Sequence, residues 1–333
     1  MTSPALDILA IGDAIVDVIA TCDDAFLTQH ELNKGSMQLL DTTAADALYA
    51  AMGPARETSG GSAANSMAGI AALGGSAGFI GQIADDQLGD IFAHDMLALG
   101  VHFATPPLPR GPDDSGPPTG RCLILVTPDA QRTMNTCPGA SHELRPDSLD
   151  EELIRSAAVL YLEGYLWGPK QPRRTMLKAA EIAHQAGRAV AFTLSESLCI
   201  PGRREGVQGM IDAGLVDLLF ANEDEARHLT ARADLETALD ELSTKVKTLV
   251  VTRGAAGAIG IDHGSRVEIR AAPVDRVVDT TGAGDLFAAG FLAARSRGHP
   301  LERCLETGAQ AAAEVISHFG ARPEADLKQL VNL

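Results

Sequence analysis

The segment Gly282-Ala-Gly-Asp285 combines small residues with a carboxylate at the expected start of a helix. Free backbone amides at a helix N-terminus bind anions, and small residues let the anion approach the backbone closely. Asp285 beside such a pocket can accept the proton of a hydroxyl that attacks a bound phosphate. The alternative is a glycine turn in which Asp285 only stabilises the first helical turn. The candidate catalytic residues for phosphoryl transfer are Asp285, Gly282, Ala283 and Gly284.

A second group of candidate residues follows the first expected strand and precedes an Ala-rich helix. Carboxylates at the carboxyl edge of a sheet can accept hydrogen bonds from the vicinal hydroxyls of a sugar ring, and glycines let the backbone lie against it. The candidate acceptor-binding residues are Asp13, Asp17, Gly60, Gly61 and Asn65. The alternatives are turn-forming aspartates and a helix entry capped by Ser62.

Asn222 and Glu225 are three residues apart, so their side chains share one face of an expected helix start. By residue type alone, Glu223-Asp-Glu225 is typical of a solvated first turn. The strand expected just before it directs this turn to the same edge of the sheet as Asp13.

The elements that would position these residues alternate between strands and helices. The chain predicts strands at 6–11, 77–80, 157–162, 188–194, 216–220 and 247–252, and helices at 42–52, 62–73, 86–99, 147–156, 172–186, 204–213, 223–231, 234–244, 283–298 and 301–318. Apolar runs such as 157–162 do not alternate, as in parallel strands buried on both faces. We therefore expect one α/β domain over 1–333, with a parallel sheet between two layers of helices.

Two segments near 14–40 and 101–137 have β character outside this alternation. Residues 121–127 and 131–137 predict a hairpin, and a second hairpin is expected near 257–270. The first two segments are expected to form a small appended β structure.

The composition of the chain limits the classes of partner that it can bind. It has 333 residues, with 27 Lys and Arg against 44 Asp and Glu, a net charge of −17. Such a charge disfavours binding to nucleic acid or to an anionic membrane, and no apolar run reaches the ~20 residues of a membrane span. The scattered cysteines predict reduced thiols in the cytoplasm, without a disulfide framework or zinc site; they are Cys22, Cys122, Cys137, Cys199 and Cys304.

Several motifs together resemble the ribokinase-like (PfkB) carbohydrate kinases. Residues 278–291 are similar to the family's C-terminal signature, D-T-x-G-A-G-D-x-F-x-x-G. Gly60-Gly-Ser-Ala-Ala-Asn65 resembles its G-G-x-x-x-N element, and Asn222-Glu-Asp-Glu225 its N-x-x-E motif. Gly12 to Asp17 and Gly81 to Gly89 also match in family order. The resemblance implies a ribokinase-like sandwich with a small β lid near 14–40 and 101–137.

The same resemblance implies an ATP-dependent kinase. It assigns ATP binding to Asn222, Thr252, Arg253, Gly254 and Gly257, magnesium to Glu225 through water, and a monovalent cation such as K⁺ to Asp279 and Thr281. Arg132 on the lid hairpin becomes a candidate phosphate clamp. The lid would close over the substrate and exclude water.

Within this family, the segment Tyr161 to Trp167 and the segment Ala191 to Ser197 resemble adenosine kinases. Tyr165, Leu166 and Trp167 could line a purine slot, although ordinary core packing is the alternative. We therefore expect conversion of adenosine to AMP in purine salvage, by a monomer or homodimer. A sugar kinase for fructose, ketodeoxygluconate or ribose is the second hypothesis, and a ligand-binding regulator without turnover is the third.

Overall fold

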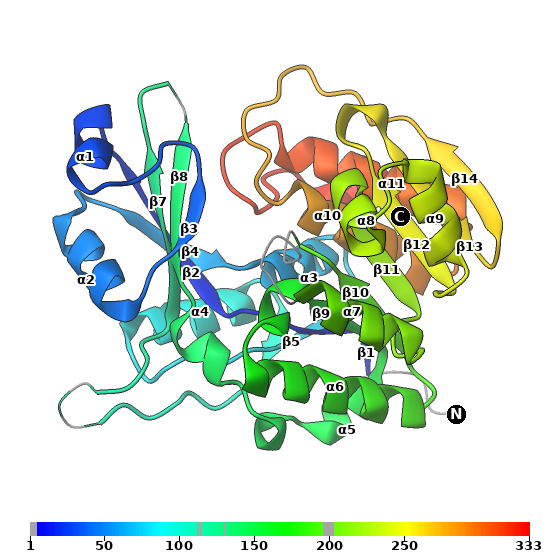
Figure 1. Ribbon diagram of the computed structural model, residues 1–333, viewed down its shortest axis with the longest axis horizontal. Coiled ribbons are helices and arrows are strands. Elements are labelled where there is room, and N and C mark those ends of the chain that lie inside the picture. The colour runs from blue at the N-terminus through cyan, green and yellow to red at the C-terminus, as the bar shows by residue number, and fades with distance from the viewer. Residues whose placement is uncertain (1–4, 112, 114, 130, 196–202) are drawn as a thin grey trace.

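The computed structural model describes residues 5–111, 113, 115–129, 131–195 and 203–333. A nine-stranded sheet lies between two layers of helices, and a five-stranded sheet stands beside it (Figure 1). The expected α/β sandwich with a small β appendage is confirmed.

The large sheet has the strand order β14-β13-β12-β11-β10-β9-β1-β5-β6. It is parallel from β12 to β6, and β13 and β14 are antiparallel additions at one edge. Its strands are β1 (Leu6–Ile11), β5 (Ala77–Ile80), β6 (Val101–Phe103), β9 (Ala157–Glu163), β10 (Ala189–Thr193), β11 (Leu218–Asn222), β12 (Thr248–Thr252), β13 (Ala258–Asp262) and β14 (Ser265–Ile269).

Helices cover both faces of this sheet because its central strands are apolar on both sides. In β1, Ile8 and Ala10 join one buried cluster, while Leu9 and Ile11 join the other. The first face packs against α3 (Ser62–Ala72), α4 (Gln87–Ala98), α10 (Ala283–Ser296), α11 (Leu301–Val315) and α12 (Leu327–Val331). The second packs against α5 (Glu151–Ser156), α6 (Lys170–Gln185), α7 (Arg203–Asp212), α8 (Glu223–Thr230) and α9 (Leu235–Ser243).

Glycines allow α3, α10 and α11 to pack closely. A Cβ at Gly69 in α3 would lie 2.7 Å from the Cβ of Ala289 in α10. A Cβ at Gly290 in α10 would lie 2.6 Å from the carbonyl oxygen of Thr307, and one at Gly308 would lie 2.7 Å from that of Phe287. All three distances are too short for a side chain. The start of α10, which carries the candidate catalytic turn, is therefore held firmly against α3.

The small sheet has the order β3-β8-β7-β2-β4. Its strands are β2 (Ile15–Thr21), β3 (Met37–Leu39), β4 (Arg56–Gly60), β7 (Gly120–Val126) and β8 (Arg132–Cys137). One face buries Val16, Val18 and Leu123 with Leu27 of α1 (Asp24–Gln29) and Leu48 of α2 (Thr42–Ala51). Figure 1 shows α1 and α2 at its outer side.

The structure corrects the expected limits of the appendage. Residues 101–103 form β6 and pair with β5 in the large sheet, while β4 joins the small sheet by pairing with β2. The helix expected over 147–156 is a 3₁₀ turn, η2 (Pro146–Ser148), followed by α5, because Asp150 caps the amide of Leu153. The other short helices are η1 (Gly139–Glu143), η3 (Gly164–Trp167) and η5 (Gly254–Ala256).

Two expectations from composition can be compared with the described residues. None of the helices there is long and apolar enough to cross a membrane. Four cysteines are free thiols, Cys22, Cys122, Cys137 and Cys304, and Cys199 lies outside the described residues.

Candidate active site

The turn before α10 has the backbone shape that its glycines allow. Gly282 is the N-cap with φ +78°, and a Cβ there would lie 2.7 Å from the Cβ of Ala321. A Cβ at Gly284 would meet no atom within 4 Å. The amide of Ala283 donates to the carbonyl of Thr280 at 3.2 Å. Open space therefore lies beside the first helical turn, as an anion site requires.

The carboxylate of Asp285 is held by two side chains of α3. Its Oδ1 accepts a hydrogen bond from the Ser62 hydroxyl at 2.6 Å, and its Oδ2 accepts one from the Asn65 amide at 2.9 Å. Burial raises the pKa of Asp285, and these two hydrogen bonds and Arg322 oppose the increase. The alternative of a helix entry capped by Ser62 is wrong, because Gly61 is the N-cap and no side chain caps that end.

Two buried acceptor atoms on the residues around Ala63 and Glu163 have no hydrogen-bond partner. They are Oδ1 of Asp13, whose residue is 8% exposed, and Oδ1 of Asn65, 5% exposed. Leaving a buried acceptor unpaired costs about 1–3 kcal/mol, so such atoms in a site are suited to a ligand's donors. These two oxygen atoms suit the hydroxyl groups of the expected substrate, the nucleoside or sugar that receives the phosphate.

The glycines at 60 and 61 make room for the two aspartates. A Cβ at Gly60 would lie 2.5 Å from the carboxyl carbon of Asp17, and one at Gly61 would lie 2.4 Å from the carbonyl oxygen of Asp13. Gly61 also has φ +89°, a conformation that other residues rarely adopt. The structure thus brings together Asp13, Asp17, Gly60, Gly61, Asn65 and Asp285, as expected.

Glu163 is a site residue that sequence reasoning missed. Its carboxylate is fully buried at the end of β9, where it accepts the amide of Ala63 at 2.7 Å and that of Asp13 at 3.4 Å. Burial and the nearby Asp13 raise the pKa of Glu163 well above its usual range. Glu163 therefore joins the exit of β1 to the first turn of α3. Its only sequence signal was its position at the carboxyl end of a buried strand.

Arg132 reaches from the small sheet to the loop before α10. Its guanidinium pairs with Asp279 at 2.8 Å and donates to the hydroxyl of Thr281 at 3.2 Å. Asp279 also accepts the amide and hydroxyl of Thr281 and the amide of Gly320. Both carboxylate oxygens of Asp279 are thus used by the protein. This arrangement does not support the expected monovalent cation at Asp279 and Thr281.

Asn222 and Glu225, which were expected to bind ATP and magnesium, form a capping box at the start of α8. The Asn222 side chain accepts the amide of Glu225, and the Glu225 side chain accepts the amide of Asn222, both at 2.8 Å. No group of three acidic, His or Cys residues within the described chain could hold a metal. Any magnesium ion would need ligands from phosphates and water as well.

The turn after β12 lies at the same edge of the sheet as this capping box. Thr252 pairs in register with Asn222, Gly254 has φ +54°, and Gly257 has φ +98°. A Cβ at Gly257 would lie 2.0 Å from the carbonyl oxygen of Ile269. The amide of Arg253 donates to the carbonyl of Gly257 at 2.8 Å, which closes the turn.

The expected purine slot at 165–167 is corrected by the structure. Leu166 and Trp167 are buried in the cluster under α6 and α7, and Trp167 packs edge-on against Phe192. Tyr165 is half-buried. The alternative of ordinary core packing therefore holds for Leu166 and Trp167. Ala191 to Thr193 form the end of β10, and residues 196–197 of the second resembling segment lie outside the described residues.

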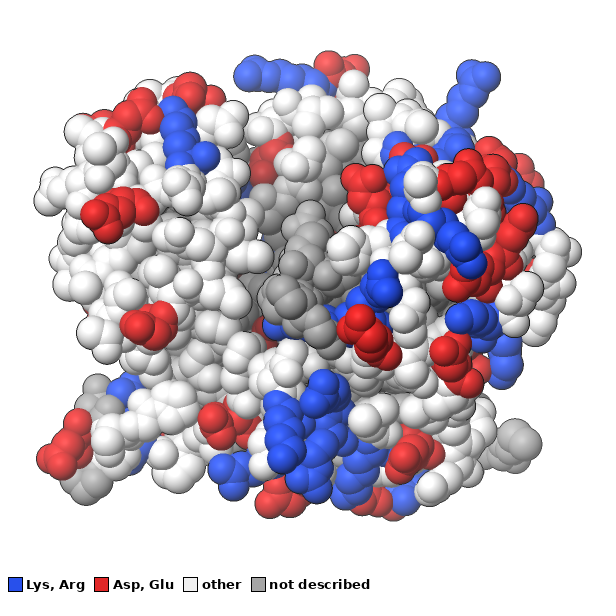
Figure 2. Space-filling view, in the orientation of Figure 1, with Lys and Arg blue, Asp and Glu red and all other residues white. Residues whose placement is uncertain are grey.

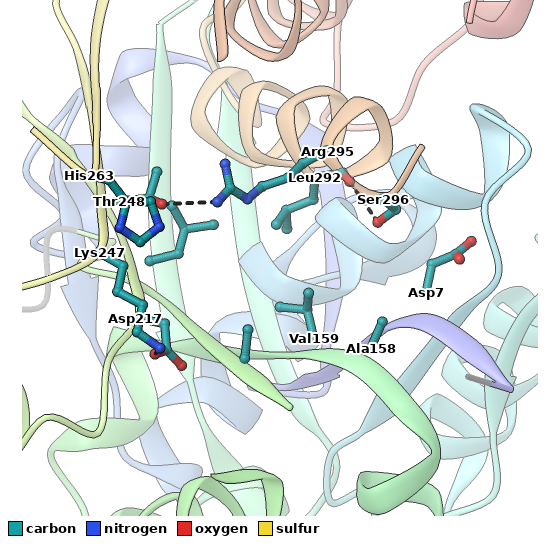
Figure 3. A pocket seen from close by; sticks show the side chains of 12 residues that line it. Asp7, Ala158, Val159, Asp217, Lys247, Thr248, His263, Leu292, Arg295 and Ser296 are labelled. Atoms are coloured by element: carbon teal, nitrogen blue, oxygen red, sulfur yellow. Dashed lines mark hydrogen bonds and ion pairs between the residues drawn. The ribbon is translucent and has the colours of Figure 1, made fainter. Parts of the chain in front are cut away.

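A cavity of about 390 Å³ lies at the opposite, amino edge of the large sheet (Figure 3). Its charged side chains already have partners: Lys247 pairs with Asp217 at 2.7 Å, Arg295 with Asp262 at 3.2 Å, and Asp7 accepts the amide of Ser76 at 2.8 Å. Arg295 also donates to the hydroxyl of Thr248 at 3.2 Å. We assign the chemistry to the carboxyl edge, where acceptor atoms are unpaired.

The molecular surface is hollowed between the small sheet and the large body (Figure 2). The carboxylate of Asp285, the open helix start beside it and the unpaired acceptors are the groups that an α/β phosphotransferase acting on hydroxyl groups requires.

Comparison with known proteins gives the family. The model of the pfkB family carbohydrate kinases matches residues 6–327, and the chain belongs to this family. Adenosine kinase from Sinorhizobium meliloti is 45% identical, with a TM-score of 0.89 and 98% of each chain covered. A probable sugar kinase from Rhizobium etli is 43% identical, with a TM-score of 0.90 and coverage of 99% of this chain and 98% of that one. The ATP-dependent ribose-1-phosphate kinase of Halopiger xanaduensis is 32% identical over 81% of this chain and 85% of its own.

The pKa of Asp17 predicts how stability depends on pH. Burial raises this pKa from 3.8 to about 6, despite opposing Arg322 and Arg132. Between pH 4 and 6 the folded protein therefore binds more protons at Asp17 than the unfolded chain does, so the contribution of Asp17 to the free energy of unfolding falls as pH rises. We expect Asp17→Asn to make this decrease smaller, as measured by urea unfolding at several pH values. An identical decrease in wild type and Asp17→Asn would contradict the assignment.

Proposed function

We propose that this kinase transfers the γ-phosphate of ATP to the 5′-hydroxyl of a nucleoside, with adenosine as the leading acceptor and AMP as the product. The observation that carries the nucleoside assignment is an apolar row on the small sheet above the hydroxyl-binding residues. The 45% identity to the adenosine kinase from Sinorhizobium meliloti supports the same acceptor.

Strand register defines the apolar row. Ile19 pairs with Ile124, Ile124 with Met134, and Met134 with Met37. Directly paired residues point to the same face of a sheet, and side chains alternate along each strand. Asp17 in β2 and Arg132 in β8 therefore share this face. Since Asp17 interacts electrostatically with Asp285 and Arg132 pairs with Asp279, the row faces the site.

This arrangement suits a nucleoside better than a free sugar. A ribose can place its hydroxyls at Asp13, Asp17 and Asn65, where carboxylate and amide oxygens accept hydrogen bonds. The flat face of an aromatic base can then cover the row of Ile and Met side chains, with its polar edge left to solvent or other groups. A free sugar would leave these side chains against polar hydroxyls.

In the proposed reaction, Asp285 accepts the proton of the attacking hydroxyl while Ser62 and Asn65 fix its orientation. The amides of Gly284 and Asp285 and the guanidinium of Arg132 would stabilise the oxygens of the transferred phosphoryl group. The space beside Gly284 leaves room for those oxygens. Magnesium bound with ATP would offset phosphate charge, and Glu225 could reach it only through water.

A sugar kinase is the second candidate. The likeness to the probable sugar kinase from Rhizobium etli and to the ribose-1-phosphate kinase supports it. The unpaired oxygens of Asp13 and Asn65 would suit a sugar equally well.

Asp285→Asn should lower kcat by about 10²–10⁴-fold, because the general base is lost. The KM for ATP should change little, since the substitution is nearly isosteric. Asp234→Asn is the matched control, because Asp234 caps the exposed start of α9 and lies in no site. A kcat for Asp285→Asn within a few-fold of wild type would reduce Asp285 to a helix-start residue.

An ATP-consumption panel with magnesium tests the acceptor. It compares adenosine, inosine and guanosine with ribose, fructose and ketodeoxygluconate, and adenosine should give the highest kcat/KM.

Met134→Gln should raise the KM for adenosine about tenfold and leave the KM for ATP unchanged, because the substitution places an amide under the base. Leu97→Gln, at an exposed apolar residue of α4, is the control. Preference for free sugars, or an unchanged KM in Met134→Gln, would overturn the nucleoside assignment.

We propose further that the small sheet acts as a lid. Acceptor binding should slow hydrogen exchange in 14–40 and 104–137, whereas ATP alone should protect mainly 252–285, because the acceptor contacts both Asp17 and the core.

Arg132→Met should lower kcat about tenfold or more while weakening acceptor binding less. Arg121→Met removes an Arg from the other face of the same sheet as a control. Exchange that is insensitive to every acceptor would make the small sheet a fixed element.

A further inference from the structure

The segment Phe319–Arg322 after α11 contacts several parts of the site. The amide of Gly320 donates to Asp279 at 2.9 Å, and Ala321 packs on the Gly282 turn. The guanidinium of Arg132 lies 5.5 Å from the ring centroid of Phe319. None of these contacts was expected from the sequence. Arg322, at the end of the segment, contributes a charge as well as hydrogen bonds.

The guanidinium of Arg322 donates to uncharged groups: two carbonyls, a hydroxyl and, at 4.0 Å, the thioether sulfur of Met96. Nη1 donates to the carbonyl of Ala64 in α3 at 2.8 Å, and Nη2 donates to the carbonyl and hydroxyl of Ser59 in β4, both at 3.1 Å. Within the described chain no carboxylate forms an ion pair with Arg322 inside 4.0 Å, and its Nε is buried without a partner. The positive charge of Arg322 is therefore not neutralised by direct contact.

Three carboxylates interact with that charge from a greater distance: Asp17 of β2, Asp285 of α10 and Asp95 of α4. Asp95 is itself held by the amide of Ser59 at 2.9 Å. Uncompensated buried charges of one sign repel and would favour protonation. A cation fixed between these elements lowers that repulsion without occupying either oxygen of Asp285.

We propose that Arg322 is a positioning residue: its bonds to Ser59 and Ala64 hold the two segments that flank Gly60 and Gly61, and from behind the site its fixed charge favours the ionised forms of Asp17 and Asp285. This inference rests on the proposed roles of Asp17 and Asp285.

The electrostatic surroundings agree with this role. Arg322 is the largest influence that lowers the pKa of Asp17 against burial, and burial lowers the pKa of Arg322 itself only to about 10. Arg322 is therefore charged at neutral pH. The other groups that face the two aspartates are Arg132 and the Cys122 thiol beside Asp17, and Tyr161 and Glu163 beside Asp285.

Two substitutions separate charge from hydrogen bonding. Arg322→Gln keeps an amide donor and removes the charge, whereas Arg322→Lys keeps the charge with a different donor geometry. The acid limb is the part of the pH profile in which kcat/KM for the acceptor falls at low pH. In Arg322→Gln, this limb should shift to higher pH by about one unit or more. In Arg322→Lys it should stay within a few tenths of a unit. The KM for ATP should be unchanged in both.

Arg297→Gln is the matched control. Arg297 also donates to two carbonyls, those of Leu73 after α3 and Ala293 in α10, at 2.8 and 2.9 Å. It lies at the far end of the same helix pair, so its loss should lower Tm without moving the acid limb. Asp17→Asn and Asp285→Asn identify which group produces the limb.

The inference fails if Arg322→Gln lowers Tm and leaves the acid limb in place, or if Arg322→Lys moves the limb as far as Arg322→Gln. If Arg322→Gln does not fold, the pH profile of Arg322→Lys decides the test. An acid limb at a pH near that of wild type supports a charge effect, and an acid limb shifted by one pH unit contradicts it. The profile is measured with whichever acceptor of the panel is turned over. A failed adenosine assignment therefore changes the acceptor but not this test.

Discussion

The hydrogen bonds from Ser62 and Asn65 to Asp285 join the start of α3 to the start of α10, and the site depends on this junction. It is possible only because the two helices approach closely at Gly69 and Ala289. The contact of Gly290 with α11 fixes α10 from its other side. The same junction places the hydroxyl-binding residues, which follow β1 and β4, beside the anion-binding turn. Small residues in the helix layer thus determine the geometry of the chemistry.

The second constraint is electrostatic, because several carboxylates gather at one edge of a protein whose net charge is −17. Asp13, Glu163 and Asp285 all have a raised pKa, caused mainly by burial. Helix-start amides, Ser62, Asn65 and a few arginines oppose this effect. Such burial costs stability, but unpaired and partly desolvated acceptors are what a hydroxyl-bearing ligand can satisfy on binding.

One face of the small sheet makes a polar contact with this edge through Arg132, while apolar residues of its other face share one buried cluster with α1, α2, α3 and α4. Arg132 connects it with Asp279, and Asp279 is held in turn by the segment after α11. A polar connection of this kind can be exchanged for contacts with phosphate at little cost, whereas an apolar interface of similar size could not. The exchange of this polar contact is the physical basis of the proposed lid.

The sequence by itself determined the alternation of strands and helices, the two faces of the large sheet and the turn at Gly282 to Asp285, because periodicity, glycine conformation and helix-start chemistry are local properties. It also placed Asp13 at the carboxyl edge, since parallel strands end together, whereas Asp17 lies within β2 of the small sheet and Asn65 within α3. It could not assign β4 and β6 to their sheets, because strand partners are chosen by packing over long separations. Only the tertiary structure decided that Leu166 and Trp167 are buried. It also decided that Glu163 and Arg322 lie near the aspartates. Contacts such as Arg322 with Ala64 join residues 258 apart in the chain, and no local pattern of residue types encodes them.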